Sequence, residues 1–154
     1  CIRDSQHHAG MSFLKTGAGF HPFMKLDDDA KGYQNFANIM KECSAVTGAC
    51  LLTTRDIFEQ IGEFDEDFDV YYGDSDLCLK IRDAGYKVVY TPFSVLLHDG
   101  SRTIRGKFNF NYFAVESHQR FMEKWPKLQN GDPFYHPILD WDYSITPEVT
   151  DTNT

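Results

Sequence analysis

Four side chains of this chain have types and positions that suit catalysis. Asp74 follows Gly73 at the predicted start of a helix, where a carboxylate can face a cleft and take a proton as a general base; the alternative is that it only caps the helix. His98 ends an apolar run, where an imidazole either binds a metal or has a structural role. Arg102 and Arg105 follow in a polar loop, where guanidinium groups bind phosphate oxygens in pairs or stay solvated.

The apolar pattern predicts the elements that position these residues. Along the chain we expect a strand near 8–14, a long polar loop over 15–45 with a short helix near 34–41, a buried strand over 45–53, helices over 54–61, 75–84 and 108–125, a strand over 86–90, and a polar tail over 146–154. Trp125, at the end of the last helix, is expected in the core. Mixed helices and short strands without a repeated βαβ unit indicate part of an α/β sheet.

Length and charge limit the classes of protein to which the chain can belong. Its 154 residues fit one domain. The net charge of −8 argues against binding to nucleic acid, which requires a basic surface. No stretch reaches the roughly 18–20 apolar residues of a membrane span. The chain starts at Cys1 without a Met or the features of a signal peptide, so we expect a domain excised from a longer protein.

The four cysteines have spacings that fit no zinc motif. Cys50 and Cys78 lie in apolar runs and are expected to be small core residues. Because nothing else indicates secretion, the sequence favours reduced thiols and a cytoplasmic location.

The acidic stretch between two predicted helices allows a competing interpretation as a calcium-binding module. Asp65, Asp67, Asp69 and Asp76 stand at positions 1, 3, 5 and 12 of a twelve-residue window, as in an EF-hand loop. The pattern departs from that loop at position 6, where Val70 replaces the required glycine, and at position 12, where aspartate replaces glutamate. Calcium titration separates this interpretation from an enzymatic one.

Four short segments occur in an order that is more specific than any one of them. They are His8-Ala9-Gly10; Val46-Thr47-Gly48-Ala49-Cys50-Leu51-Leu52; Gly62-Glu63-Phe64-Asp65-Glu66 with Gly73-Asp74-Ser75-Asp76-Leu77-Cys78-Leu79-Lys80 and Ala84-Gly85-Tyr86; and Tyr90-Thr91-Pro92 with His98 and the Ser101-Arg102 loop. Over roughly residues 6–140 this order resembles the second half of family 2 glycosyltransferases of the GT-A fold, including rhamnosyltransferase-like members.

The resemblance implies a partial GT-A-like α/β domain, with a short mixed sheet flanked by helices and a long C-terminal helix. Residues 1–145 would form the half that binds the acceptor and carries the catalytic base. The N-terminal nucleotide-binding half, with the Asp-x-Asp motif that holds metal and diphosphate, would be absent. The run Asp27-Asp28-Asp29 follows the His-Ala-Gly segment, which is the wrong place for that motif, and we expect a solvated loop there.

The resemblance also implies roles for individual residues. Asp74 would be the catalytic base, although the family usually has Glu where Gly73 stands. The other roles are acceptor binding by Gly48, Ala49 and Asp76, diphosphate binding by Arg102 or Arg105, and binding of Mn²⁺ or Mg²⁺ by His98. The alternatives are tight packing at Gly48 and Ala49, and an exposed acid in the first helical turn at Asp76.

An inverting, metal-dependent glycosyltransferase is the function that the resemblance implies. It would move a sugar from a nucleotide-diphosphate sugar to an acceptor hydroxyl in the synthesis of surface polysaccharide or glycoconjugate, and this fragment alone would be inactive. The expected partners are the nucleotide-sugar donor, a saccharide or lipid-linked acceptor and the missing half, but not nucleic acid. The enzyme would be cytoplasmic, at the inner face of the membrane if the aromatic helix over 108–125 contacts a bilayer. The alternative is a non-catalytic module that binds sugars or other proteins.

Overall fold

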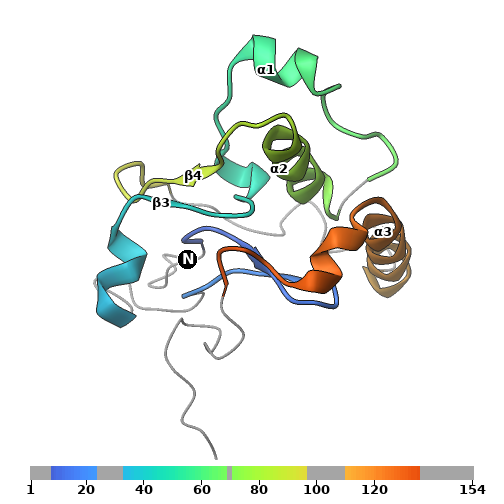
Figure 1. Cartoon of the computed structure of the whole chain (residues 1–154), viewed down its shortest axis with the longest axis horizontal. Helices are drawn as coiled ribbons and strands as arrows, with labels where there is room; N and C mark the ends of the chain where they lie inside the picture. Colours follow the sequence, from blue (N-terminus) through green and yellow to red (C-terminus); the bar gives the residue numbers. More distant parts are fainter. Residues whose placement is uncertain (1–7, 24–32, 69–70, 97–109, 136–154) are drawn as a thin grey trace, which may run out of the picture.

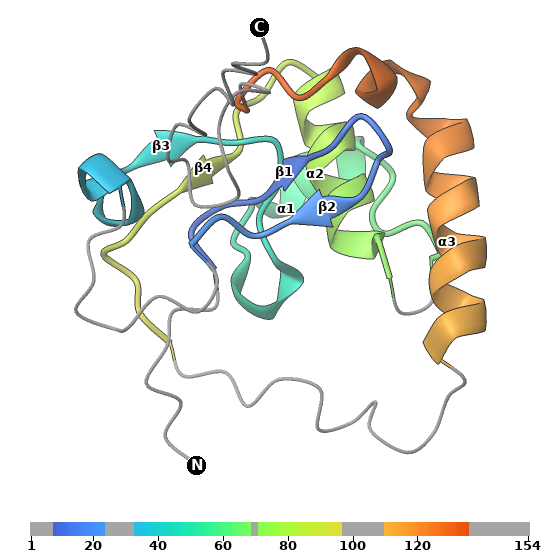
Figure 2. The same cartoon turned by 90° about the horizontal axis from the view of Figure 1, so that it is seen from below.

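The computed structural model describes residues 8–23, 33–68, 71–96 and 110–135. In chain order its elements are β1 (Ser12–Phe13), β2 (Gly19–Phe20), η1 (Tyr33–Asn38), β3 (Lys41–Glu42), η2 (Gly48–Cys50), α1 (Arg55–Gln60), α2 (Gly73–Asp83), β4 (Val89–Tyr90), α3 (Phe110–Lys124) and η3 (Pro126–Asn130). The β3–β4 pair lies at one end of the molecule and α3 at the other, with α2 and the β1–β2 pair between them (Figures 1 and 2). The helix that carries Asp74 is therefore central.

The described strands form two short antiparallel pairs, β1 with β2 and β3 with β4. A bridge between Met11 and Ala45 joins the two pairs, and the N–H of Met11 donates to the carbonyl of Ala45 over 2.8 Å. The predicted α/β class is confirmed, and the strands expected near 8–14 and over 86–90 are present in shortened form.

The buried strand predicted over 45–53 is wrong, because the chain turns there. Gly48–Cys50 forms the short 3₁₀ helix η2, and the hydroxyl of Thr47 accepts a hydrogen bond of 3.4 Å from the N–H of Ala49. This local bond competes with strand pairing. Cys50 is exposed, contrary to the core position expected for it, whereas Cys78 is buried as predicted.

In α2, the positions of the charged residues and of the apolar residues both favour the helix that the sequence predicts. The acids of the first turn and the bases of the last turn complement the helix dipole. Gly85 follows the helix with φ of +89°, a backbone conformation that glycine adopts at little cost. The buried residues of α2 are Ser75, Asp76, Leu77, Cys78, Leu79 and Ile81.

Helix α3 confirms the long helix predicted over 108–125 and closes the core. The ring of Phe121 is fully buried, and its centroid lies 4.5 Å from that of Tyr72 and 5.6 Å from that of Phe13. Trp125 is buried directly after the helix, as predicted. Among the described residues, no helix is both long and apolar enough to cross a bilayer.

The segment after α3 returns to the first strand. The Asp132 carboxylate accepts hydrogen bonds from the N–H of Phe13 over 2.8 Å and from the N–H of Phe134 over 2.7 Å. Burial raises the pKa of Asp132, and these donors oppose the rise. A buried carboxylate thus ties residues near the two ends of the described core together.

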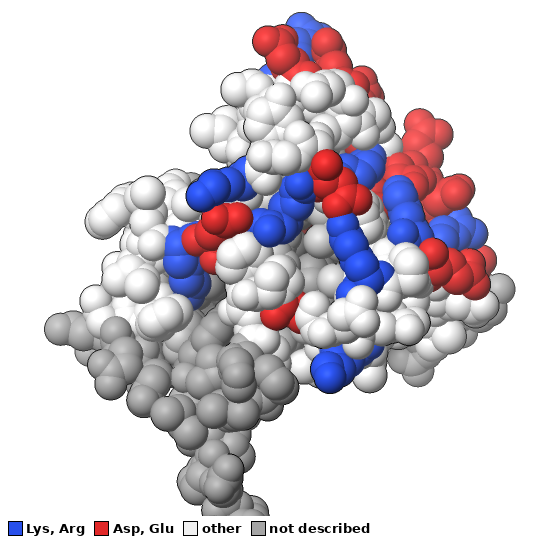
Figure 3. Space-filling model, in the orientation of Figure 1, with Lys and Arg blue, Asp and Glu red and all other residues white. Residues whose placement is uncertain are grey.

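The charged side chains on the face drawn in Figure 3 are interleaved, with acidic groups beside basic ones. Ion pairs form among the described residues, such as Arg82 with Glu42 at 3.1 Å and Lys127 with Asp83. Ion pairs near the protein surface contribute little stability each. Their arrangement gives this face no broad basic surface of the type that binds nucleic acid.

Candidate functional site

Asp74 lies in the first turn of α2, where two backbone N–H groups hold its half-buried carboxylate. Its Oδ2 accepts a hydrogen bond of 2.9 Å from Gly48, and its Oδ1 accepts one of 2.8 Å from Ser75. Within the described residues, no basic side chain forms an ion pair with Asp74. Each carboxylate oxygen has two lone pairs, so the group keeps the capacity to accept a proton.

The N-cap of α2 is Tyr72, so Asp74 is not the cap. Tyr72 has φ of 69°, and its side chain makes no capping hydrogen bond. The first helical bond runs from the N–H of Asp76 to the carbonyl of Tyr72 over 2.7 Å. The interpretation of Asp74 as only a helix cap is therefore wrong: its Oδ1 accepts from the first-turn N–H of Ser75, but its Oδ2 binds a different element, η2.

The structure brings two predicted site residues, Gly48 and Asp74, into contact. A Cβ atom at Gly48 would lie 3.2 Å from the Cβ of Asp74 and 3.7 Å from its Oδ2. The first distance is shorter than an ordinary packing contact, and the second is ordinary. Gly48 and Ala49 are exposed, so the turn beside the carboxylate faces solvent. Their role in acceptor binding stays a prediction.

His8 also binds this turn, at the residue before Gly48. The N–H of Thr47 donates to His8 Nε2 over 3.3 Å, and His8 Nδ1 lies 2.9 Å from Nδ1 of His21. Burial, followed by the neighbouring His21 and Lys41, lowers the pKa of His8 from 6.5 to about 3. His8 is therefore a neutral imidazole at physiological pH, and its Nε2 is an acceptor.

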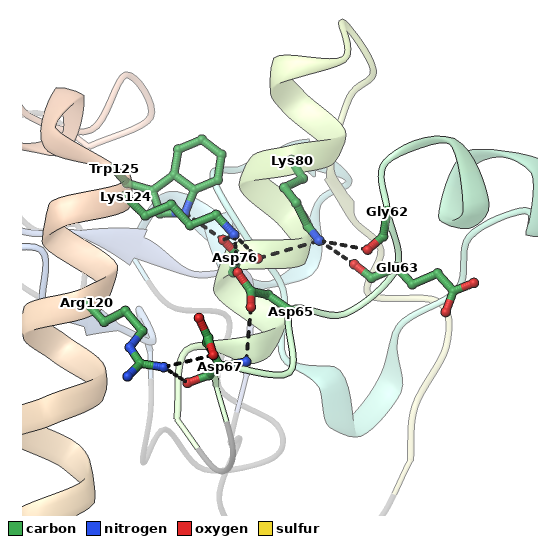
Figure 4. Close-up of polar contacts among 9 residues, drawn as sticks. All are labelled: Gly62, Glu63, Asp65, Asp67, Asp76, Lys80, Arg120, Lys124 and Trp125. Atoms are coloured by element: carbon green, nitrogen blue, oxygen red, sulfur yellow. Dashed lines mark hydrogen bonds and ion pairs between the residues drawn. The ribbon is translucent and has the colours of Figure 1, made fainter.

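Asp76 is fully buried, so the expectation of an exposed acid in the first turn is wrong. Figure 4 shows its carboxylate between α2 and the end of α3. Trp125 donates from Nε1 to Oδ1 over 2.8 Å, Lys124 Nζ lies 2.8 Å from the same oxygen, and Lys80 Nζ lies 3.7 Å from Oδ2. These groups occupy both oxygens, so Asp76 has no face open to an acceptor and instead fixes the helix that carries Asp74.

The acids of the loop before α2 are also held by side chains of α3 (Figure 4). Asp65 lies 2.5 Å from Lys124 Nζ, and Asp67 lies 3.2 Å from Arg120. The hydrogen bond from Lys124 lowers the pKa of Asp65. Burial alone would lower the pKa of Lys124, but its hydrogen bonds to Asp65 and Asp76 raise it.

These contacts contradict the calcium-binding interpretation. An EF-hand directs its carboxylates inward onto one ion. Here Lys124 and Arg120 neutralise three of the four acids of the window, and Asp76 is buried beneath Trp125. The fourth, Asp69, lies outside the described residues.

The predicted metal ligand His98 and the predicted phosphate-binding residues Arg102 and Arg105 lie outside the described residues. Within the described part of the chain, no three His, Cys, Asp or Glu side chains are grouped so that they could hold a metal ion. The described residues therefore do not make a metal site by themselves.

Sequence reasoning missed the contact of His8 with the site. The His-Ala-Gly segment is part of the motif order, but His8 reaches Thr47 across 39 positions of sequence. The only sign in the sequence was a histidine at the start of an apolar stretch. That position does not indicate which distant residue the histidine contacts.

Comparison with known proteins gives three informative matches. The chain is 34% identical over 140 residues to the uncharacterized protein y4gI of Sinorhizobium fredii, which is 86% of this chain and 15% of that protein. It is 32% identical over 137 residues to the O-antigen biosynthesis protein RfbC of Myxococcus xanthus, which is 86% of this chain and 10% of that protein. It is 42% identical over 53 residues to an N-acetylglucosaminyl-diphospho-decaprenol L-rhamnosyltransferase of Mycobacterium tuberculosis.

The chain is similar to only a part of each of these proteins. The last match covers 34% of this chain and 17% of the relative, so the chain spans between 10% and 17% of the length of the three relatives. No family model matches the chain. No solved structure matches it either.

Proposed function

We propose that this chain is the acceptor-binding, catalytic-base part of a GT-A-like, family 2 glycosyltransferase that works with inversion in polysaccharide synthesis. The observation that carries the proposal is the carboxylate of Asp74, which backbone N–H groups hold at the start of the central helix beside an exposed turn. Similarity to the O-antigen biosynthesis protein and the rhamnosyltransferase supports this class of reaction.

The reaction requires a base at the acceptor. As the acceptor hydroxyl attacks the anomeric carbon of the donor sugar, its proton passes to an oxygen of Asp74. The new bond joins the acceptor oxygen to the anomeric carbon, the bond to the diphosphate breaks, and the diphosphate leaves with the electron pair. The anomeric carbon has oxocarbenium character in this step. Attack from the face opposite the diphosphate gives inversion.

The turn at Gly48 and Ala49 gives the acceptor a place beside Asp74. Both residues are exposed and neither has a side chain larger than methyl, so a sugar ring can approach the backbone closely. The acceptor is a saccharide, free or linked to a lipid. Asp76 takes a supporting role, since Trp125 and Lys124 hold its carboxylate.

The departing diphosphate needs neutralisation, which Mn²⁺ or Mg²⁺ supplies when bound. His98 and the two arginines of the same loop, Arg102 and Arg105, remain the candidates from this chain for binding the cation and the diphosphate. Further ligands would come from the nucleotide-binding half of the whole protein. The proposal for Asp74 does not depend on which of these groups binds the cation.

Replacement of Asp74 tests the proposal. In the whole protein, Asp74→Asn is expected to lower turnover by roughly 10²- to 10⁴-fold, because it removes the proton acceptor, while affinity for the donor stays within about twofold of wild type. Turnover is followed as release of nucleoside diphosphate from a panel of nucleotide-diphosphate sugars. Asp56→Asn is the matched control, because Asp56 also lies in a first helical turn and is exposed. Turnover near the wild-type rate in Asp74→Asn removes Asp74 from the base role.

A further inference from the structure

We infer that His8 is a positioning residue for the catalytic base: its imidazole accepts from the N–H of Thr47 and so holds the turn in which the N–H of the next residue, Gly48, points at Asp74. This inference rests on the proposed function for its catalytic meaning, and on hydrogen-bond geometry for its structural content. His8 itself does not contact the carboxylate and acts through the turn.

Two successive backbone N–H groups of one turn bind two different side chains. The N–H of Thr47 donates to His8 Nε2 over 3.3 Å, and the N–H of Gly48 donates to Asp74 Oδ2 over 2.9 Å. The two N–H groups belong to consecutive peptide units, Val46–Thr47 and Thr47–Gly48, so His8 fixes the first unit and Asp74 the second. If the bond at His8 is lost, the turn can rotate and the bond at Asp74 weakens.

The hydrogen bonds also define which nitrogen of each imidazole carries a proton. Because Nε2 of His8 accepts from Thr47, the proton of a neutral His8 lies on Nδ1. That N–H points at Nδ1 of His21, which lies 2.9 Å away and accepts, so the proton of a neutral His21 lies on its Nε2. His21 thus selects the tautomer of His8 that can hold the turn.

The groups around His8 disfavour protonation of its imidazole. The rings of His21 and Tyr90 pack edge-on against it with centroids 5.1 and 6.2 Å away. Burial opposes protonation of the imidazole, and so do positive charges on His21 and Lys41. A protonated His8 would direct an N–H at the N–H of Thr47, and the support of the turn would be lost.

A pair of substitutions separates the hydrogen bond from packing. Gln in His8→Gln can place a side-chain oxygen near the position of Nε2 and accept from Thr47. Leu in His8→Leu fills similar space and cannot accept. If His8 acts by accepting the hydrogen bond from Thr47, His8→Gln retains function and His8→Leu loses it. A role in packing alone does not predict this difference between the two variants.

The amide of Gly48 reports the arrangement without any assay of activity. Labelling Thr with ¹³C at the carbonyl and Gly with ¹⁵N selects Thr-Gly pairs by NMR, and this chain contains two, Thr16-Gly17 and Thr47-Gly48. Gly17 donates to the carbonyl of Leu14 and serves as the internal control for folding. Asp74→Asn supplies the reference position for a Gly48 amide that has lost its carboxylate.

We expect the Gly48 signal of His8→Leu to move in the same direction as in Asp74→Asn, with Gly17 unchanged, and that of His8→Gln to stay near wild type. In the whole protein, His8→Leu should lower kcat roughly tenfold or more with little change in donor KM, and His8→Gln should retain most of the rate. An unmoved Gly48 signal in His8→Leu, or equal shifts in both variants, overturns the inference. If Asp74→Asn keeps full turnover, the proposed function fails, while the Gly48 signal still decides whether His8 positions the turn.

Discussion

The indole N–H of Trp125 donates a 2.8 Å hydrogen bond to the carboxylate of Asp76, which lies 49 positions earlier in the chain. Both side chains are buried, with 6% and 0% of their surface exposed. Since Asp76 and Asp74 share the first turn of α2, the bond fixes the turn that carries the candidate base. The geometry of the site therefore depends on the end of α3.

Replacing Trp125 with Phe is expected to destabilise the protein by about 1–3 kcal/mol, because a buried carboxylate loses a hydrogen-bond donor while most of the ring is kept. The free energy of unfolding in urea measures the effect. Tyr86→Phe is the matched control: it removes an aromatic donor that binds Gln60 at an exposed site, and should cost no more than about 0.5 kcal/mol. Equal stability of the two variants would contradict a structural role for the indole N–H.

Adding a methyl group at Gly48 is expected to displace Asp74. The new Cβ would lie 3.2 Å from the Cβ of Asp74, so the carboxylate must shift by a few tenths of an ångström. We expect Gly48→Ala to lower kcat of the whole protein roughly tenfold. Gly73→Ala is the control. Gly73 directly precedes Asp74, and its added Cβ would lie 3.6 Å from the backbone oxygen of Phe68, which is an ordinary contact. Equal rates for the two variants would show that the close approach has no catalytic importance.

The helices could be predicted because their signals are local. Thr54 caps α1 by accepting from Ile57 over 3.3 Å, and Gly62 follows with φ of +79°, as the sequence indicates. The helix predicted over 75–84 begins two residues earlier, at Gly73. The carbonyl of Tyr72 accepts the first helical hydrogen bond, and the Tyr72 side chain makes no capping hydrogen bond.

The contacts that make the site could not be predicted from pattern alone. Gly48 and Asp74 are 26 positions apart, and the bond between them depends on a turn where the sequence suggests a strand. Asp76 has the position of an ordinary solvated first-turn acid. Its burial follows from a lysine and an indole brought by a distant helix, which no local signal records.

Acid is expected to destabilise the wild-type protein more than His8→Gln. The pKa of His8 is lowered from 6.5 to about 3 in the folded state, first by burial and then by His21 and Lys41. Between these values the unfolded chain binds a proton that the folded protein does not, so stability is lost as pH falls from 6.5 towards 3. From pH 7 to pH 5 this amounts to about 2 kcal/mol for one group. Urea unfolding at the two pH values gives the comparison, and an equal loss in both proteins would contradict a buried neutral His8.

The described cysteines are expected to differ in reactivity. Cys50 is exposed, whereas Cys43 and Cys78 are buried, and burial raises the pKa of Cys78 to about 12. Because thiolates react and thiols do not, iodoacetamide at pH 8 should label Cys50 first. Cys43, whose pKa burial also raises, and Cys78 should be labelled only when urea unfolds the protein. Peptide mass spectrometry measures the order, and early labelling of Cys78 would contradict the packing of α2.

The hydrogen bond between Phe13 and Asp132 joins residues 119 positions apart. The points where the chain enters and leaves the described core are therefore neighbours. A segment with this property can be inserted into a larger polypeptide with little disturbance of the host.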